Sequence, residues 1–316
     1  MRMYYCSDLH GSTTCWLKFL SSAKFYKADV VVVGGDITGK FVTPIMDQGD
    51  GTWTAELMGH VRKLKNEQEL IDFEKSIAHT GAYPFRTTQE EADFVSADSE
   101  RVETLFKKLV VRRIEEWMDL ADTRLKGSGI RCLVQPGNDD AFEIDAILEQ
   151  SEIVENTDGK VIDLEGDAQI IGLGYCNMTP WNCPRDIPEE ELTTRIDALA
   201  SQLAHMDRAI FDFHVPPFAS TLDSCPRLND DLSIVMTSSG PEIAPAGSTA
   251  VRTAIEKYQP MLGLHGHIHE SKGATTIGRT VCVNSGSEYG EGILDGIIIE
   301  LDMKKGKIKS TQLVSG

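Results

Sequence analysis

The sequence predicts an α/β fold whose functional site lies along the carboxyl-terminal edge of a sheet. Residues 29–33 form a β-branched run without polar alternation, which is typical of a strand buried on both faces. This run leads to Asp36, and an earlier apolar run at residues 3–6 leads to Asp8. A helix is expected at residues 12–27. Repeated strand–turn–helix units bring the carboxyl ends of their strands to one edge of a sheet.

The same rhythm returns after residue 129. We expect further strands at 130–134, 161–164, 169–173, 209–213, 261–264, 280–283, 296–301 and 307–313, and helices at 141–150, 189–205 and 248–258. The stretch 218–247 carries Gly, Pro and Ser without clear periodicity, and it is expected to be a long loop.

Residues 41–127 interrupt this rhythm. We expect a small meander from strands at 43–46, 53–57 and 60–64, followed by helices at 66–78 and 98–126. Apolar residues recur close to every 3.6 positions in the last helix, which indicates one buried face. The prediction is a single domain over residues 1–316 with a mostly helical insertion at 41–127 packed on it. A lid or a partner surface is the alternative role of the insertion.

Composition limits the classes of partner. The chain has 49 acidic against 31 basic residues and a net charge of −18, which opposes binding to a nucleic-acid backbone. A phosphate site in such a chain would need bound cations. No apolar run is long enough to span a bilayer, and the first residues run directly into a strand, so we expect no signal peptide. Seven scattered cysteines without a CxxC pair indicate reduced thiols and a cytoplasmic location.

Histidines gather after one of the predicted strands. The stretch Leu264–Glu270 holds three of the eight histidines, at positions 265, 267 and 269. In an extended segment, His267 and His269 face the same side. Imidazoles held in this way are good ligands for zinc, iron or manganese ions.

Other candidate metal ligands also follow apolar runs. Seven oxygen or nitrogen donors fall at five strand ends, namely Asp8, His10, Asp36, Asn138, His214, His267 and His269. Seven ligands are too many for one tetrahedral ion but suit two ions that share a bridging carboxylate. Asp36 is the natural bridge because it is the one carboxylate alone on its strand.

These motifs resemble the calcineurin-like metallophosphoesterase superfamily in identity, order and context. The resemblance covers residues 1–40 and 130–300, and it rests on Asp8-x-His10, Gly35-Asp36, Gly137-Asn138-Asp139, His214 and Gly266-His267-Ile268-His269. It implies two packed mixed β-sheets flanked by helices, a four-layer αββα fold. It also implies two divalent transition-metal ions, Mn²⁺ first among Mn²⁺, Fe and Zn²⁺. One would be bound by Asp8, His10, Asp36 and His269, and the other by Asp36, Asn138, His214 and His267. Hydroxide between them would be the nucleophile.

One position departs from the family pattern. The family usually has a histidine after Gly-Asn that assists the departing alkoxide, and this chain has Asp139 there. An aspartate does not ordinarily donate a proton at neutral pH unless it is desolvated or close to another carboxylate. The acid could therefore be Asp139, His265 or a metal-bound water, or the substrate could have a leaving group that needs no protonation.

Substrate contacts have weaker candidates. Tyr175, Asn177 and Arg185 lie on a loop after a predicted strand, where substrate contacts often occur. Ser248 opens a helix whose free N–H groups could receive an anion, although an ordinary cap explains it as well.

The sequence therefore predicts a dinuclear metal-dependent phosphoesterase, with a phosphodiesterase favoured, that acts on a small or nucleotide-like phosphate ester. A metal-dependent nuclease is the nearest alternative, and the acidic composition argues against it. A non-catalytic protein-binding scaffold of the same fold is the other alternative, and the complete ligand set argues against that. The expected partner is a small phosphorylated substrate, with no membrane partner.

Overall fold

The alternation of side chains along strand β1 (Arg2–Cys6) shows why the sequence needs several layers. Met3 and Tyr5 join one apolar core, whereas Tyr4 and Cys6 join another on the opposite face of the sheet. All four side chains are buried. A strand of this kind needs an apolar layer on both sides. The computed structural model, which describes residues 1–57 and 59–316, supplies both layers.

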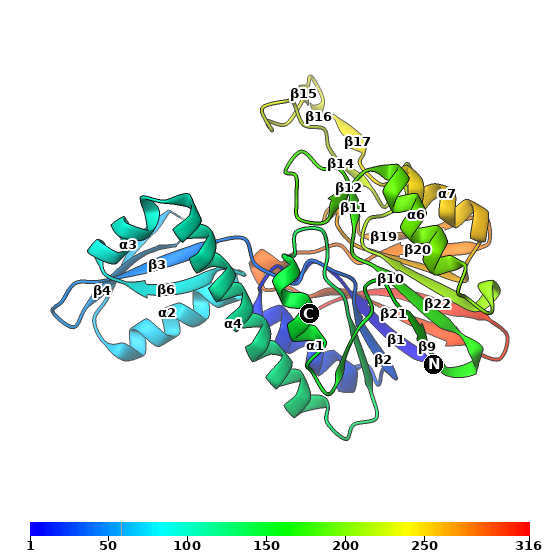
Figure 1. Cartoon of the computed structure of the whole chain (residues 1–316), viewed down its shortest axis with the longest axis horizontal. Coiled ribbons are helices and arrows are strands. Elements are labelled where there is room, and N and C mark those ends of the chain that lie inside the picture. The colour runs from blue at the N-terminus through cyan, green and yellow to red at the C-terminus, as the bar shows by residue number, and fades with distance from the viewer. Residues whose placement is uncertain (58) are drawn as a thin grey trace.

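Two six-stranded sheets form the centre of the molecule (Figure 1). The first sheet has the spatial order β22 (Lys307–Ser315), β21 (Asp295–Asp302), β1, β2 (Val30–Val33), β7 (Arg131–Val134) and β8 (Val154–Asn156). The second has the order β19 (Gly273–Ile277), β20 (Thr280–Asn284), β18 (Leu262–His265), β13 (Ala209–Phe213), β10 (Gln169–Leu173) and β9 (Val161–Asp163). One apolar core contains inward-facing residues of both sheets, so the sheets pack face to face.

Parallel pairing aligns the strand ends that matter for function. In the first sheet β1, β2, β7 and β8 pair in parallel, and in the second β10, β13, β18 and β20 do so. The turns after parallel strands all leave from the same edge of a sheet. The turns after β1, β2 and β7 are therefore neighbours, and so are those after β13 and β18.

Helices cover the outer face of each sheet. Helices α1 (Thr13–Phe25), α4 (Ser99–Leu125) and α5 (Asp145–Leu148) share a core with the first sheet. Helices α6 (Glu189–Ala200) and α7 (Thr249–Tyr258) share a core with the second. This helix–sheet–sheet–helix order confirms the predicted four-layer fold class.

Residues 41–127 form a unit with its own small sheet. Strands β5 (His60–Leu64), β4 (Trp53–Leu57), β3 (Val42–Asp47) and β6 (Tyr83–Thr87) pair in that order, and α2 (Glu67–His79) packs on them. Helix α3 (Gln89–Ser96) precedes α4, which runs from this unit to the main body (Figure 1). The meander of β3, β4 and β5 was predicted, and so were helices α2 and α4. Helix α3 was not predicted. Strand β6 was missed because Pro84 is tolerated only at an edge strand, the position that β6 occupies.

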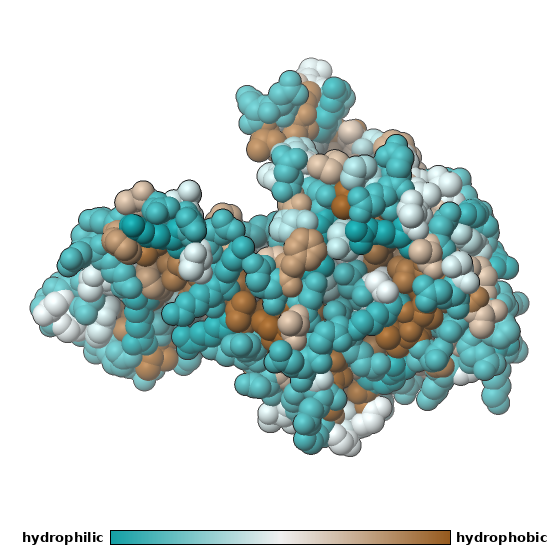
Figure 2. Space-filling view, viewed as in Figure 1, coloured by the Kyte–Doolittle hydropathy of each residue, from teal (hydrophilic) through white to brown (hydrophobic). Residues whose placement is uncertain are grey.

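The predicted loop at 218–247 is wrong in part. It contains short strands at β14 (Ser224–Pro226), β15 (Met236–Thr237), β16 (Gly240–Pro241) and β17 (Ile243–Pro245), which project from the body (Figure 1). Figure 2 shows hydrophobic surface on this projecting segment, where Met236 and Ile243 are exposed. These strands pair as β14 with β17 and β15 with β16. Strands of two or three residues are too short to give the alternation that sequence patterns detect.

Several other elements are short. They are η1 (Phe142–Ile144), η2 (Glu165–Asp167), β11 (Cys176–Asn177), β12 (Asp186–Ile187), η3 (Met206–Arg208) and η4 (Tyr289–Glu291). The expected helix at 141–150 is thus divided between η1 and α5, and α6 ends at Ala200 rather than at 205. Across residues 1–57 and 59–316, no helix combines the length and apolar character needed to cross a membrane.

Candidate metal centre

The seven predicted metal ligands lie one to four residues beyond the ends of five strands. Asp8 and His10 follow β1, Asp36 follows β2, Asn138 follows β7, His214 follows β13, and His267 and His269 follow β18. Two sheets contribute to this set. The imidazole Nδ1 of His214 lies 2.8 Å from the carbonyl oxygen of Gly34 and so joins the edges of both sheets.

Backbone strain turns several of these side chains toward a common space. Asp8, His10, Asp36 and His267 have φ angles of 60°, 41°, 51° and 65°. Residues other than glycine rarely adopt this left-handed region, and each instance costs about 1–3 kcal/mol. Such strain persists where the surrounding structure fixes it, and it is concentrated here in four of the seven predicted ligands.

Two glycines explain why the motifs read Gly-Asn and Gly-His. A Cβ atom on Gly137 would lie 2.2 Å from Asp36 Oδ1, and one on Gly266 would lie 2.4 Å from Asp8 Oδ2. Both distances are far below van der Waals contact. A side chain at either position would displace a carboxylate that belongs to another strand end.

The first group of donors surrounds Asp8. Its Oδ1 lies 3.4 Å from His269 Nε2 and 4.0 Å from His10 Nε2. The two imidazole Nε2 atoms are 3.1 Å apart. These three residues offer donor atoms that all lie within 4.8 Å of one another, as ligands of one ion would.

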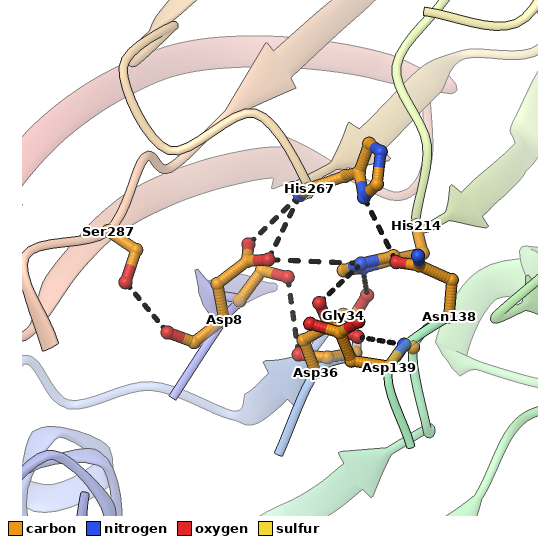
Figure 3. A network of polar contacts seen from close by, with 12 residues as sticks. Asp8, Gly34, Asp36, Asn138, Asp139, His214, His267 and Ser287 are labelled. Carbon is orange, nitrogen blue, oxygen red and sulfur yellow. Dashed lines mark hydrogen bonds and ion pairs between the residues drawn. The ribbon is translucent and has the colours of Figure 1, made fainter. Parts of the chain in front are cut away.

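The second group surrounds His214 and His267. The imidazole Nδ1 of His267 lies 3.0 Å from Asn138 Oδ1. Asp36 lies between the two groups, because its Oδ2 is 3.4 Å from His214 Nε2 and 3.6 Å from His10 Nε2. The structure therefore brings all seven residues into one cluster, in which Asp36 joins the two groups. Figure 3 shows five of them, namely Asp8, Asp36, Asn138, His214 and His267.

The charges in this cluster fit bound cations. Asp8 is fully buried and Asp36 is 2% exposed, and in the described part of the chain their ionic partners are histidines alone. Two buried carboxylates without Lys or Arg are costly unless cations neutralise them. In addition, His214 Nε2 is buried without a hydrogen-bond partner among the described residues. An unpartnered nitrogen facing two carboxylates is what a metal ligand requires.

The pKa values agree with this view. Burial opposes ionisation of Asp8, yet a hydrogen bond with His269 and the charge of His214 lower its pKa to about 2. Burial likewise opposes protonation of His214, but the carboxylates of Asp36 and Asp8 raise its pKa to about 10. The two carboxylates therefore favour a positive charge at His214, and a bound cation would take the place of that proton. Burial lowers the pKa of His10 and of His267 to about 4, which leaves both rings neutral and able to bind metal.

Hydrogen bonds fix the orientation of the donors (Figure 3). The backbone N–H of His267 donates to Asp8 Oδ2 at 3.0 Å, and the N–H of Asp139 donates to Asp36 Oδ1 at 3.0 Å. Asn138 Nδ2 donates to Asp186 Oδ1 at 3.0 Å, which turns its amide oxygen toward His267. Ordered partners of this kind set ligand geometry.

Asp140 joins two of the ligand-bearing turns. Its Oδ2 accepts from the backbone N–H groups of Ile37 at 3.0 Å and Gly137 at 2.8 Å. Its Oδ1 accepts from the N–H of Thr38 at 2.8 Å and from the Thr38 hydroxyl at 2.5 Å. The turn after β2 and the turn after β7 are therefore held by a single buried carboxylate. In the sequence Asp140 is only the second residue of an Asp pair, and no local pattern indicates its role.

Asp139, at the position that departs from the family pattern, lies at the edge of the cluster and already has partners. Its Oδ2 forms an ion pair with Lys40 and lies 4.0 Å from His10 Nδ1. The Cys183 thiol donates to its Oδ1 at 2.8 Å. Although burial opposes it, the Asp139 carboxylate raises the pKa of Lys40. The pair places a partly exposed cation at the edge of the cluster, and Lys40 was not predicted from the sequence.

The other catalytic candidate, His265, lies outside the donor cluster. It is fully buried, and its Nδ1 bonds to the carbonyl oxygen of Phe213 at 2.8 Å. Its ring lies over Gly263 of its own strand, where a Cβ would be 2.7 Å from Nε2. Burial lowers its pKa to about 4. The strand alternation that directs it into the helix-covered core explains why it does not face the donors, so the prediction of an acid role is not supported.

Two of the four substrate candidates are committed to internal contacts. Arg185 is 1% exposed and pairs with Asp145 at 2.5 Å and Asp158 at 3.4 Å. Ser248 caps α7, and the Glu189 carboxylate already fills that helix N-terminus by accepting from the Ser248 hydroxyl at 2.7 Å. Partners far away in the sequence occupy both groups, and substrate contact stays a prediction for each.

The remaining two candidates lie beside β11. The Tyr175 ring is covered by the Arg195 guanidinium, whose carbon lies 4.2 Å from the ring centre. Asn177 Oδ1 is buried without a hydrogen-bond partner in the described chain. Contact with a substrate stays a prediction for both.

Tyr289 and Cys176 also lie against the cluster, and neither was predicted from the sequence as a site residue. Tyr289 packs against His10 with ring centres 4.7 Å apart and an angle of 50° between the rings. Cys176 offers a sulfur within 4.8 Å of ring nitrogens of His214 and His267. Tyr289 sits in a short 3-10 turn and has no motif around it. The stretch Gly174–Asn177 follows a predicted strand in the same way as the ligand turns do, and that position was the available signal for Cys176.

Comparisons with known proteins bear on the fold. No protein-family model matches the chain. An uncharacterized protein of Methanocaldococcus jannaschii, MJ1162, is 29% identical over 173 residues, which cover 54% of this chain and 68% of that protein. One solved structure covers 98% of both chains with 17% identity and a TM-score of 0.55. The structure of TT1561 of Thermus thermophilus covers 100% of this chain and 97% of its own, with 15% identity and a TM-score of 0.52. These structural likenesses show a shared fold.

Proposed function

We propose that the chain, whose two packed six-stranded sheets and ligand motifs resemble the calcineurin-like metallophosphoesterases, is a dinuclear metal-dependent phosphoesterase, and within that class a phosphodiesterase. One observation carries the proposal. Seven oxygen and nitrogen donors from five strand ends meet in one largely buried cluster, and its two carboxylates have histidines as their ionic partners in the described chain. A protein-binding scaffold would have no need for this set.

The donors divide into two sets. Asp8, His10, Asp36 and His269 would hold one cation, and Asp36, Asn138, His214 and His267 would hold the other. Divalent cations bound there would polarise phosphoryl oxygens and lower the pKa of an attacking water. Mn²⁺ is the first ion to test, since carboxylate and imidazole donors suit it.

The chain supplies the remaining chemistry through its own charges. The ammonium group of Lys40 lies beside Asp139 at the edge of the cluster, and the Lys40 side chain is 40% exposed. A fixed cation at this place would stabilise a phosphate oxygen or the alkoxide that departs. Asp139 would position Lys40 by their ion pair. This arrangement favours diesters with leaving groups that need charge stabilisation more than a proton.

We expect Lys40→Met to lower kcat/KM for bis-p-nitrophenyl phosphate by about tenfold, because hydrogen bonds to charged groups contribute about 1.5–3 kcal/mol. Lys40→Arg should retain more activity, since it keeps the positive charge. Steady-state hydrolysis of the metal-loaded variants measures this effect.

Lys65→Met is the matched control, because Lys65 is an exposed lysine in the small-sheet unit. It should leave kcat/KM unchanged. Equal activity of Lys40→Met and wild type would exclude a role of Lys40 in substrate stabilisation.

The function itself is tested by removing metal with a chelator, reloading with Mn²⁺, and assaying three substrates. Bis-p-nitrophenyl phosphate, p-nitrophenyl phosphate and single-stranded DNA separate a diesterase, a monoesterase and a nuclease. We expect the diester to turn over fastest, and we expect little cleavage of DNA because the net charge is −18. Absence of turnover with every metal and substrate would refute the enzyme assignment.

A further inference from the structure

The thiol of Cys176 faces the donor cluster. Cys176 is fully buried, and its Sγ lies with one ring nitrogen each of His214 and His267 in a group whose members are all within 4.8 Å of one another. Of the seven cysteines, it is the one that joins any of the donor groups found among the described residues. The ligand sets proposed above from Asp, Asn and His residues do not include it.

A second observation points to a ligand in the same place. The Nε2 atom of His214 is fully buried and has no hydrogen-bond partner in the described chain. Its ring cannot simply turn away, because Nδ1 is held by the carbonyl oxygen of Gly34 at 2.8 Å. Nε2 faces Asp36 Oδ2 at 3.4 Å and Asp8 Oδ1 at 3.8 Å, and the same ring forms one donor group with Cys176 and His267. A buried polar atom of this kind is costly unless something binds it.

The frame around Cys176 is rigid. Its backbone N–H donates to the carbonyl oxygen of Arg185 at 3.2 Å, and the N–H of Arg185 donates to the carbonyl oxygen of Asn138 at 3.2 Å. The Arg185 guanidinium is itself anchored by Asp145 and Asp158. Strands β11 and β12 therefore tie Cys176 to the turn that carries Asn138. The buried Arg185 therefore has a structural role in this frame.

We propose that Cys176 is a sulfur ligand of the second metal position, together with His214 and His267. This inference rests on the metal centre of the proposed function and adds a donor of a different class to it. Thiolate donors favour Zn²⁺ or Fe over Mn²⁺, whereas the Asp8, His10 and His269 group offers only oxygen and nitrogen. The two positions then differ in the metal that they prefer, and the second selects a thiophilic ion.

The test uses the full-length protein, stripped of metal and titrated with Co²⁺ under reducing conditions. A thiolate ligand gives a near-ultraviolet sulfur-to-cobalt charge-transfer band, which carboxylate and imidazole ligands do not give. We expect this band in the wild type and its loss in Cys176→Ala and Cys176→Ser, while the visible cobalt bands remain. Cys282→Ala is the matched control, because Cys282 is buried in the helix-covered core of the second sheet and should leave the band intact.

Competition provides a second measurement. Cys176→Ala should weaken Zn²⁺ binding at one position by at least about tenfold and change Mn²⁺ binding by less than about twofold. Equal losses for both ions, or a charge-transfer band that persists without Cys176, would overturn the inference. If neither Cys176 variant folds, the wild-type spectrum decides, and a protein that binds cobalt without the band refutes the sulfur ligand.

Failure of this inference can be told apart from failure of the proposed function. A wild-type protein that binds two ions without a sulfur band refutes the Cys176 ligand alone. A protein that takes up no cobalt, with no visible bands, refutes the metal centre and with it both proposals.

Discussion

We expect Asp36→Asn to lower hydrolysis of bis-p-nitrophenyl phosphate by more than about a hundredfold, since losing a residue that only orients a ligand already costs about 10- to 100-fold. Asp36 lies 3.4 Å from His214 and 3.6 Å from His10, at the junction of the two donor groups. The asparagine keeps the shape of the side chain but loses the charge that two cations would share. Both metal affinity and turnover should therefore fall together.

Asp163→Asn is the control for this substitution, because Asp163 also ends a strand but is exposed on the edge strand β9. It should leave turnover and metal content unchanged. Metal content by mass spectrometry and kcat/KM by absorbance give the two readouts. Wild-type turnover in Asp36→Asn would show that Asp36 does not bridge two catalytic ions.

Trp117→Ala should lower the free energy of unfolding by about 3–5 kcal/mol, the usual cost of removing a large buried aromatic side chain. Trp117 of α4 stacks on Trp16 of α1, with ring centres 4.9 Å apart and an angle of 4° between the rings. Trp16 Nε1 donates to the Trp117 carbonyl oxygen at 3.1 Å, and Trp117 Nε1 donates to the Thr13 hydroxyl at 3.3 Å. The substitution leaves a cavity and removes the hydrogen bond to Thr13 where α4 joins the main body.

Urea denaturation followed by circular dichroism measures this loss. Glu115→Ala, on the exposed face of the same helix, should change stability by less than about 0.5 kcal/mol. An equally small change in Trp117→Ala would mean that α4 contributes little to the core, and that the unit at 41–127 is attached more loosely than the packing indicates.

The positions of the seven donors could be predicted because local patterns carry the information. Each donor follows an apolar run, and parallel sheets bring such strand ends together. The apolar run at 29–33 indicates a strand buried on both faces, and Asp36 lies in the turn that follows this strand. Only the spatial order of the strands was beyond reach, because pairing partners such as β1 and β21 lie far apart in the chain.

The roles of polar residues outside the motifs could not be predicted, because their partners are remote in sequence. Ser248 lies 59 residues from the Glu189 that occupies its helix N-terminus, and Arg185 lies 40 residues from Asp145. Either residue would suit a phosphate if it were free. Lys40 and Cys176 belong to no recognisable motif. Only the fold brings Lys40 beside Asp139 and Cys176 beside His214.

The number of divalent ions bound per chain decides whether the site is dinuclear. Chelator-treated protein would be reloaded, passed through a desalting column and measured by mass spectrometry alongside its turnover of bis-p-nitrophenyl phosphate. We expect two ions per wild-type chain and fewer in Asp36→Asn. Activity of the wild type should rise as the second ion binds. A wild-type protein that binds no more metal than Asp36→Asn, or that hydrolyses the diester equally well without metal, would contradict it.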